Sequence, residues 1–249
     1  MSFSIISLNA RGLRQNIKRK ALFLFAKHQK NDFFFFQETH SVQNDTQLWK
    51  VQWGNDIWLS HGSDRAAGAA ILKNSFNGKI LHSEADTKGH FFILVINTND
   101  TIILLVNIYG YNSKGENDTL LGVLESRILY WLSNYPSAMI VMGGDFNVAL
   151  DGLQDRWPPR ANPSLASTLI QFMHKFGLVD IWRGKNPGVL SYTWSNKTNT
   201  SLSRIDFWLI SNDFDKNGIN VDIIPTPLTD HKEISIQFSL NPHISHRNS

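Results

Sequence analysis

Short apolar runs recur along the chain and are separated by glycine, asparagine and aspartate residues. Runs of about four to eight residues with such boundaries are typical of β-strands in a sandwich or a mixed sheet. Several runs are apolar throughout, which predicts strands that are buried on both faces. The predicted strands cover residues 3–8, 33–36, 57–60, 67–72, 91–97, 101–108, 138–142, 205–210 and 234–238.

Three further stretches repeat their apolar residues at helical spacing and predict amphipathic helices. The first covers residues 17–28, and the second, at 120–132, follows Asp118, which we interpret as its capping residue. The third covers residues 163–176 and stops at Gly177, a favourable residue after a helix C-terminus. Because strands outnumber helices and do not alternate strictly with them, we predict a layered α/β sandwich rather than a Rossmann-type array.

Composition narrows the class of protein. The chain has 249 residues, and no linker rich in proline, glycine or serine divides it, so we expect one domain over residues 1–240 and a polar tail over 241–249. It contains no cysteine, which excludes disulfides, a thiol nucleophile and a cysteine-based zinc site. The apolar runs are too short to cross a bilayer, so no membrane partner is expected. A net charge of +3 permits nucleic-acid binding without requiring it.

Polar residues stand where the predicted strands end or begin. Taken singly, such residues are usually turn formers or ordinary surface groups. Gathered at one rim of the sandwich, they would form a ligand or catalytic site. The residues in question are Asn9, Glu38, Tyr109, Asp145, Asn147, Asp206, Asp230 and His231.

These motifs resemble, in type and order, those of the endonuclease/exonuclease/phosphatase superfamily. Gly-Asp-Phe-Asn at 144–147 and Thr-Asp-His at 229–231 are specific in combination. Tyr-Thr-Trp-Ser at 192–195, Asp-Ile-Trp-Arg at 180–183 and the segment 204–211 look closer to one branch. That branch holds the apurinic-endonuclease-like domains of LINE-type non-LTR retrotransposon polyproteins. The resemblance implies a DNase I-like, four-layer α/β sandwich, with two mixed β-sheets packed face to face and helices outside.

The resemblance also implies an activity and partners. Family members of this type nick one strand of duplex DNA and leave a 3′-hydroxyl and a 5′-phosphate, which in a retrotransposon primes reverse transcription at the target site. Nothing in the sequence resembles a reverse transcriptase, so the chain looks like the endonuclease domain of a longer polyprotein that supplies one. We expect the isolated domain to be a monomer and, from its DNA substrate alone, to act in the nucleus.

The oxygen-bearing residues suggest how a cation could take part. Hydrolysis of a phosphodiester needs an activated water, stabilisation of transition-state charge and help for the leaving oxygen. Glu38 and Asn9 offer the hard oxygen ligands that Mg²⁺ prefers, and Mn²⁺ is a possible substitute. Asp230 is a candidate secondary ligand.

The remaining residues can share the proton transfers and the phosphate contacts. Asp145 is the natural base or water-positioning carboxylate. Asn147 and Tyr109 can donate hydrogen bonds to the phosphate. His231 is expected to contact a non-bridging oxygen, while Asp206 holds its ring and favours the imidazolium.

A polar stretch at 195–203 is expected to form a hairpin, which in the resembling family lies beside the site and probes the DNA groove. It has one cation and many small hydroxyl and amide groups, which favours recognition of groove shape at deformable steps over a strict target sequence. The predicted DNA contacts are Arg11, Thr193, Asn196, Lys197 and Arg204.

Three other functions stay open on this scaffold. The nearest is an abasic-site endonuclease of DNA repair. A phosphatase or phosphodiesterase would need a basic headgroup pocket, for which no motif is visible. An inactive DNA-binding module would be expected to have lost Glu38, Asp145 or His231, and all three are present.

Overall fold

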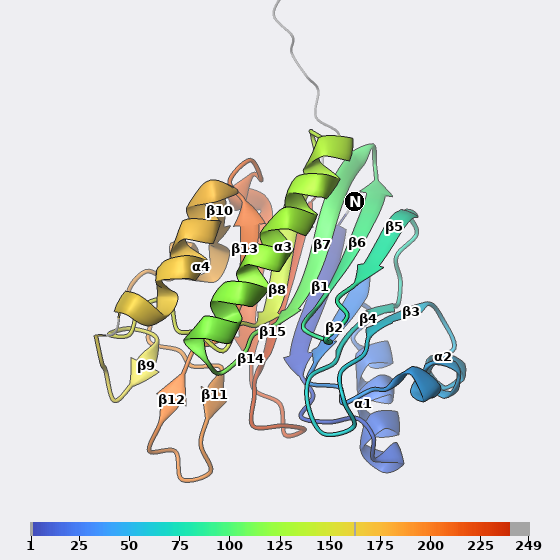
Figure 1. The fold of residues 1–249 in the computed structure, drawn as a ribbon, viewed down its shortest axis with the longest axis horizontal. Coiled ribbons are helices and arrows are strands. Elements are labelled where there is room, and N and C mark those ends of the chain that lie inside the picture. Colours follow the sequence, from blue (N-terminus) through green and yellow to red (C-terminus); the bar gives the residue numbers. More distant parts are fainter. Residues whose placement is uncertain (1, 162, 240–249) are drawn as a thin grey trace, which may run out of the picture.

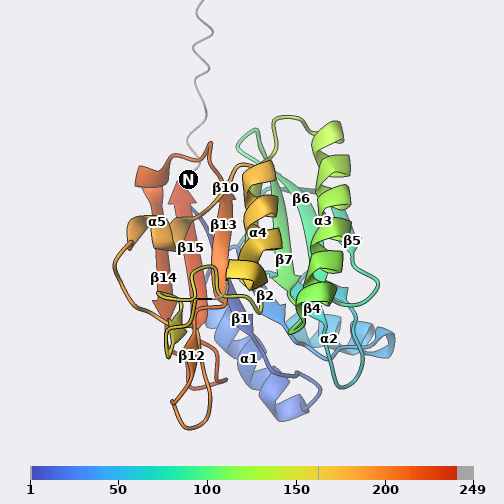
Figure 2. The ribbon, with the colours of Figure 1, turned by 60° about the vertical axis from the view of Figure 1, so that its left-hand side comes forward.

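The computed structural model describes residues 2–161 and 163–239, and within these ranges the strands form two six-stranded sheets and one three-stranded sheet. The two large sheets pack face to face, and helices cover their outer faces (Figure 1, Figure 2). The predicted four-layer α/β sandwich is therefore confirmed. The tail predicted at residues 241–249 lies outside the described residues.

The first large sheet has the strand order β14-β15-β1-β2-β4-β3, and the second has the order β10-β13-β8-β7-β6-β5. The first comprises β1 (Ser2–Asn9), β2 (Phe33–Gln37), β3 (Ile57–Ser60), β4 (Ala69–Lys73), β14 (Ile219–Ile224) and β15 (Glu233–Ser239). The second comprises β5 (Lys79–Ala85), β6 (Phe91–Thr98), β7 (Thr101–Tyr109), β8 (Met139–Asp145), β10 (Leu178–Asp180) and β13 (Asp206–Ser211). The small sheet comprises β9 (Arg156–Trp157), β11 (Trp194–Ser195) and β12 (Leu202–Ser203).

Every predicted strand overlaps an observed one. The strands β5, β9, β10 and β14 were not predicted, and β11 and β12 were expected only as parts of a hairpin. β5 lies at the edge of its sheet and is largely exposed, so it carries no continuous apolar run. β14 alternates buried Ile219 and Val221 with exposed polar residues, a period of two that the search for apolar runs overlooked.

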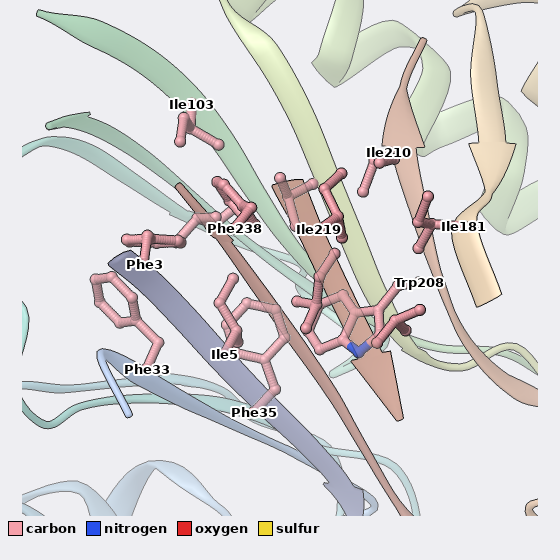
Figure 3. Packing of buried hydrophobic residues seen from close by; sticks show 14 of the residues in the cluster. Phe3, Ile5, Phe33, Phe35, Ile103, Ile181, Trp208, Ile210, Ile219 and Phe238 are labelled. Carbon is pink, nitrogen blue, oxygen red and sulfur yellow. The ribbon is translucent and has the colours of Figure 1, made fainter. Parts of the chain in front are cut away.

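The run of phenylalanines in β2 shows how one strand serves two layers. Successive side chains of a strand point to opposite faces. Phe33 and Phe35 therefore enter the core between the two large sheets, which also contains Trp208 (Figure 3). Phe34 and Phe36 point the other way and pack with buried residues of the outer helices. The predicted burial on both faces is confirmed for this strand.

The helices cover both outer faces. Their bounds are α1 (Asn16–His28), α2 (Thr46–Trp53), α3 (Lys114–Asn134), α4 (Pro163–Lys175) and α5 (Ile181–Lys185), with short 3₁₀ turns η1 (Gln43–Asp45) and η2 (Lys216–Gly218). The clusters of buried residues place α1 and α2 against the first sheet, and α3 and α4 against the second. No helix in the described ranges is long and apolar enough to span a membrane.

The predicted cap of the second helix is wrong. α3 begins six residues earlier than its apolar pattern, at Lys114, and Ser113 caps it by accepting a hydrogen bond from the Glu116 N–H. Asp118 lies inside the helix and accepts a 2.5 Å hydrogen bond from Lys114. The first turn of α3 is polar, so the apolar periodicity begins only at Leu120.

The topology brings six strand termini to one edge of the sandwich. β1 and β2 run parallel and end together, as do β7 and β8. β13 is antiparallel to β8 and β15 is antiparallel to β1, so both begin where the others end. The hairpin of β11 and β12 projects from the same end of the molecule (Figure 1). The polar residues at these termini are thereby gathered.

Candidate active site

Two carboxylates and an imidazole form the buried centre of the site. Asp206 and Asp145 are paired in register on β13 and β8. The Nδ1 atom of His231 lies 2.9 Å from Asp206 Oδ2, and its Nε2 atom lies 3.9 Å from Asp145 Oδ2. All three residues are buried. Their ligand atoms lie within 4.8 Å of one another, so the group could also hold a metal ion.

Burial and mutual charge shift the pKa values of His231 and Asp145. Burial alone would lower the pKa of His231, but the negative charges of Asp206, Asp145 and Asp230 outweigh it and raise that pKa to about 9. Burial and then the charge of Asp206 raise the pKa of Asp145 to about 7. Near neutral pH, His231 is therefore an imidazolium that donates hydrogen bonds, and Asp145 can gain or lose a proton.

Two amides hold Asp145 in place. The Asn9 Nδ2 atom donates to Asp145 Oδ2 over 2.8 Å, and the Asn147 N–H donates to Asp145 Oδ1 over 2.9 Å. Asn147 adopts a left-handed backbone conformation with φ 53°, a region that asparagine tolerates better than most residues. Its Nδ2 atom donates to the Gly110 carbonyl at the end of β7. The carboxylate is thus oriented from both large sheets.

Tyr109 and Glu38 also line the site. The Tyr109 hydroxyl interacts with Glu38 and with Asn147. Burial, followed by the charges of Glu38 and Asp145, raises the pKa of Tyr109 far above its usual value. The phenol therefore keeps its proton and serves as a hydrogen-bond donor. The Glu38 carboxylate also lies 3.4 Å from His40 Nε2.

An ion pair stands at the entrance to the site. The exposed Arg11 guanidinium pairs with Asp230 Oδ2, and Trp194 Nε1 donates to the same oxygen over 3.1 Å. The other oxygen, Asp230 Oδ1, is buried and has no hydrogen-bond partner in the described part of the chain. Asp230 therefore has one oxygen atom without a protein partner.

These groups enclose a cavity of about 340 Å³. Seven of the predicted residues line it, while Asp206 contacts His231 and Asp230 lines a neighbouring cavity together with Trp194 and His231. The lining is Asn9, Arg11, Glu38, Tyr109, Asn112, Asp145, Asn147, Arg156, Trp194, Ser203, Ile205 and His231.

Sequence reasoning missed Asn112, Arg156, Trp194, Ser203 and Ile205. Asn112 follows the predicted strand end at Tyr109 by three positions, so a wider search around that end would have found it. Arg156 belongs to the two-residue strand β9, which has no sequence signal of its own. The antiparallel pairing of β9 with β12 brings it to the cavity.

Two predicted DNA contacts are wrong. Thr193 and Arg204 are both 0% exposed. The Thr193 hydroxyl accepts hydrogen bonds from the N–H groups of Ile205 and Asp206, each over 3.1 Å. Arg204 binds Asp155 through two hydrogen bonds and pairs with Asp180 at 2.7 Å. Both side chains hold the protein together and are not available to a ligand.

Asn196 and Lys197, the two predicted DNA contacts in the hairpin, are not buried. Asn196 organises the turn, because its Oδ1 atom accepts hydrogen bonds from the N–H groups of Thr200 and Ser201. Lys197 is exposed beside it. Of the five predicted DNA contacts, Arg11, Asn196 and Lys197 remain predictions.

The sequence matches the model of the Endonuclease/Exonuclease/phosphatase family over residues 6–231, a range that contains every residue of the site. It is 27% identical over 247 residues to the Transposon TX1 uncharacterized 149 kDa protein of Xenopus laevis, and this match covers 98% of the chain but only 19% of that relative. The fold is similar to an AP endonuclease from Leishmania major, with a TM-score of 0.78, 17% identity, and 96% and 88% of the two chains covered. It is also similar to a 3′-5′ exonuclease from Neisseria meningitidis, with a TM-score of 0.74, 16% identity, and 96% and 100% covered.

Proposed function

This chain belongs to the Endonuclease/Exonuclease/phosphatase family, and we propose that it is an endonuclease that nicks one strand of duplex DNA. The products are a 3′-hydroxyl and a 5′-phosphate. One observation carries the proposal: a single cavity combines a carboxylate that can accept a proton, an imidazolium and a protonated phenol. These are the groups that attack by water on a phosphodiester requires.

The residues divide the reaction between them. Asp145 accepts a proton from the water whose oxygen bonds to phosphorus. The bond from phosphorus to the 3′ oxygen breaks, and that oxygen takes up a proton from solvent water to give the 3′-hydroxyl. His231 and Tyr109 donate hydrogen bonds to the phosphate and stabilise its added negative charge. Asp206 keeps His231 protonated and fixes its ring through Nδ1.

The residues of the cavity fit a hard divalent cation such as Mg²⁺ or Mn²⁺. Glu38 supplies a carboxylate and Asn9 an amide oxygen. Asp230, which is paired with the lining residue Arg11, has a further oxygen, Oδ1, without a hydrogen-bond partner in the described part of the chain. When bound, the cation would supply Lewis-acid stabilisation of charge on the phosphate.

The similarity to a transposon protein supports a biological context. We propose that the chain is the endonuclease part of a longer transposon polyprotein, since it spans 19% of that relative. A nick with a free 3′-hydroxyl would then prime a reverse transcriptase domain of the same polyprotein. Such a role would place the protein in the nucleus, where its DNA substrate is.

A plasmid-nicking assay tests the activity. With Mg²⁺, we expect supercoiled plasmid to become open circles that DNA ligase reseals, because ligase requires a 3′-hydroxyl and a 5′-phosphate. Glu38→Gln and Asp145→Asn should each slow nicking by about a hundredfold or more. Glu125→Gln, which alters a carboxylate paired with Lys175 on the helical surface, is the matched control and should keep the full rate. Full nicking activity in EDTA would contradict the proposed requirement for a divalent cation.

A second substrate separates this proposal from DNA repair. A duplex with one abasic site is compared with the same duplex intact, under the same conditions. Comparable nicking of both duplexes is expected for a transposon endonuclease. Cleavage confined to the abasic duplex would instead assign the chain to abasic-site repair.

A further inference from the structure

A buried histidine outside the cavity contacts Tyr109 through both its main chain and its ring. His90 directly precedes β6 and is 5% exposed. The Tyr109 N–H donates to the His90 carbonyl over 2.7 Å. The His90 Nδ1 atom lies 2.6 Å from the Tyr109 carbonyl oxygen. A carbonyl oxygen only accepts hydrogen bonds, so Nδ1 carries the proton.

The imidazole also stacks on two tyrosine rings. Its centroid lies 5.5 Å from that of Tyr109 with the planes 10° apart, and 3.6 Å from that of Tyr111 with the planes 20° apart. Burial lowers the pKa of His90, which favours the neutral ring. A neutral imidazole with Nδ1 protonated can hold Tyr109 without adding a charge next to the site.

Both ends of this stack are anchored. The main-chain N–H of His90 donates to Asp86 Oδ2 over 2.8 Å. On the other side, Asn117 of α3 accepts a hydrogen bond from the Tyr111 N–H and donates one to the Tyr111 carbonyl, each over 2.7 Å. Because its neighbours are held in place by these hydrogen bonds, the imidazole can restrict the motion of the Tyr109 ring on which it stacks.

We propose that His90 is a positioning residue that holds the main chain and ring of Tyr109, so that the phenol hydroxyl stays aimed into the cavity. The inference rests on the proposed function, because the hydroxyl matters only if it contacts the scissile phosphate. A misplacement of about 1 Å in such a donor can cost on the order of a hundredfold in rate.

A double-mutant cycle tests whether His90 acts through Tyr109. His90→Leu is expected to lower kcat for plasmid nicking by at least about tenfold when Tyr109 is present. In a Tyr109→Phe background the same change should lower kcat less than about twofold, because the hydroxyl to be positioned is gone. Equal losses in both backgrounds would show a merely structural role and would overturn the proposal.

Two further variants separate the hydrogen bond from the stack and allow for poor folding of His90→Leu. His90→Asn keeps an N–H donor without the ring, and His90→Phe keeps a ring without the donor. Each should restore part of the lost kcat relative to His90→Leu. His82→Leu is the matched control. Like His90, His82 contacts an aromatic ring and makes a hydrogen bond, but its partners are the Trp131 ring and the Tyr135 hydroxyl, away from the site. His82→Leu should keep the wild-type kcat. No rescue by either His90 variant would overturn the specific role.

A spectroscopic measurement keeps this proposal separate from the proposed function. The tyrosines are replaced by 3-fluorotyrosine, and the ¹⁹F resonance of Tyr109 is identified by its loss in Tyr109→Phe. Relaxation of this resonance should report greater mobility of the Tyr109 ring in His90→Leu than in the wild type. In His82→Leu the mobility of this ring should equal that of the wild type. If wild-type protein proves not to nick DNA, the proposed function fails. The relaxation measurement still shows whether His90 restrains the Tyr109 ring. Unchanged mobility in His90→Leu would overturn the positioning role.

Discussion

At the scale of single residues, the site is a set of charges whose protonation states depend on one another. His231 is protonated near neutral pH because three carboxylates surround it, and Asp145 titrates near neutrality because it is buried beside Asp206. The sequence predicted these partners from motif order. It could not predict the shifts themselves, because burial and distance are properties of the folded chain.

The pH dependence of nicking follows from these values. The active form has Asp145 ionised and His231 protonated, so kcat/KM should rise with pH through about 7 and fall through about 9. Asp206 raises both values, so Asp206→Asn should shift both limbs of the profile to lower pH. Asp215→Asn, at the start of the surface turn η2, is the control and should leave the profile unchanged. A basic limb that stays in place in Asp206→Asn would show that the two residues are not coupled.

At the scale of elements, the hairpin of β11 and β12 is fixed at its base and exposed at its tip. Its base contacts the buried centre of the site. The Thr193 hydroxyl accepts a hydrogen bond from the Asp206 N–H, and the main chain of Trp194 forms an antiparallel β-bridge with that of His231. Thr193 and Arg204 had been predicted to contact DNA. Arg204 instead meets Asp155, which is 49 positions away, and no local pattern announces such a pairing.

Exchange of the hairpin tip tests its part in target choice. Replacing residues 197–200 with glycine and serine, while Asn196 is kept, should redistribute nick positions on one plasmid because groove shape would be sensed differently. Lys197→Ala should instead weaken binding by a similar factor at all sites and reduce the salt dependence by about one counterion. Nick positions are mapped by primer extension. An unchanged pattern at full rate after the exchange would show that the tip takes no part in target choice.

At the scale of the whole molecule, the sequence predicted the layers better than the cavity. Apolar runs such as that of β2 identify buried strands because the physical cause of burial is local in sequence. The exposed edge strand β5 and the two-residue strand β9 give no such signal, and β9 carries Arg156 to the cavity. The site also draws on both large sheets: Asn9 ends a strand of one sheet and Glu38 follows another of its strands, while Asp145 ends a strand of the other sheet.

A buried hydrogen-bond clamp joins these two sheets close to the site. Asn107 of β7 donates through Nδ2 to the carbonyls of Phe36 and Ala70, on two strands of the opposite sheet, over 3.0 and 2.8 Å. Its Oδ1 atom accepts a 2.6 Å hydrogen bond from Gln37, whose Nε2 atom also donates to Ser7. Gln37 directly precedes the proposed cation ligand, so the clamp sets the position of one half of the site against the other.

Removal of the clamp should therefore affect stability and activity together. Asn107→Ala leaves buried polar groups unpaired and should lower the free energy of unfolding by about 2–4 kcal/mol, measured by urea denaturation. It should also slow nicking at temperatures where the variant is fully folded, because the two sheets would lose their fixed offset. Ser211→Ala removes a buried acceptor of the Ile140 N–H from the opposite end of the second sheet, and it should cost stability without slowing nicking. If Asn107→Ala is destabilised but nicks at the wild-type rate, then packing of the core alone sets the offset between the sheets.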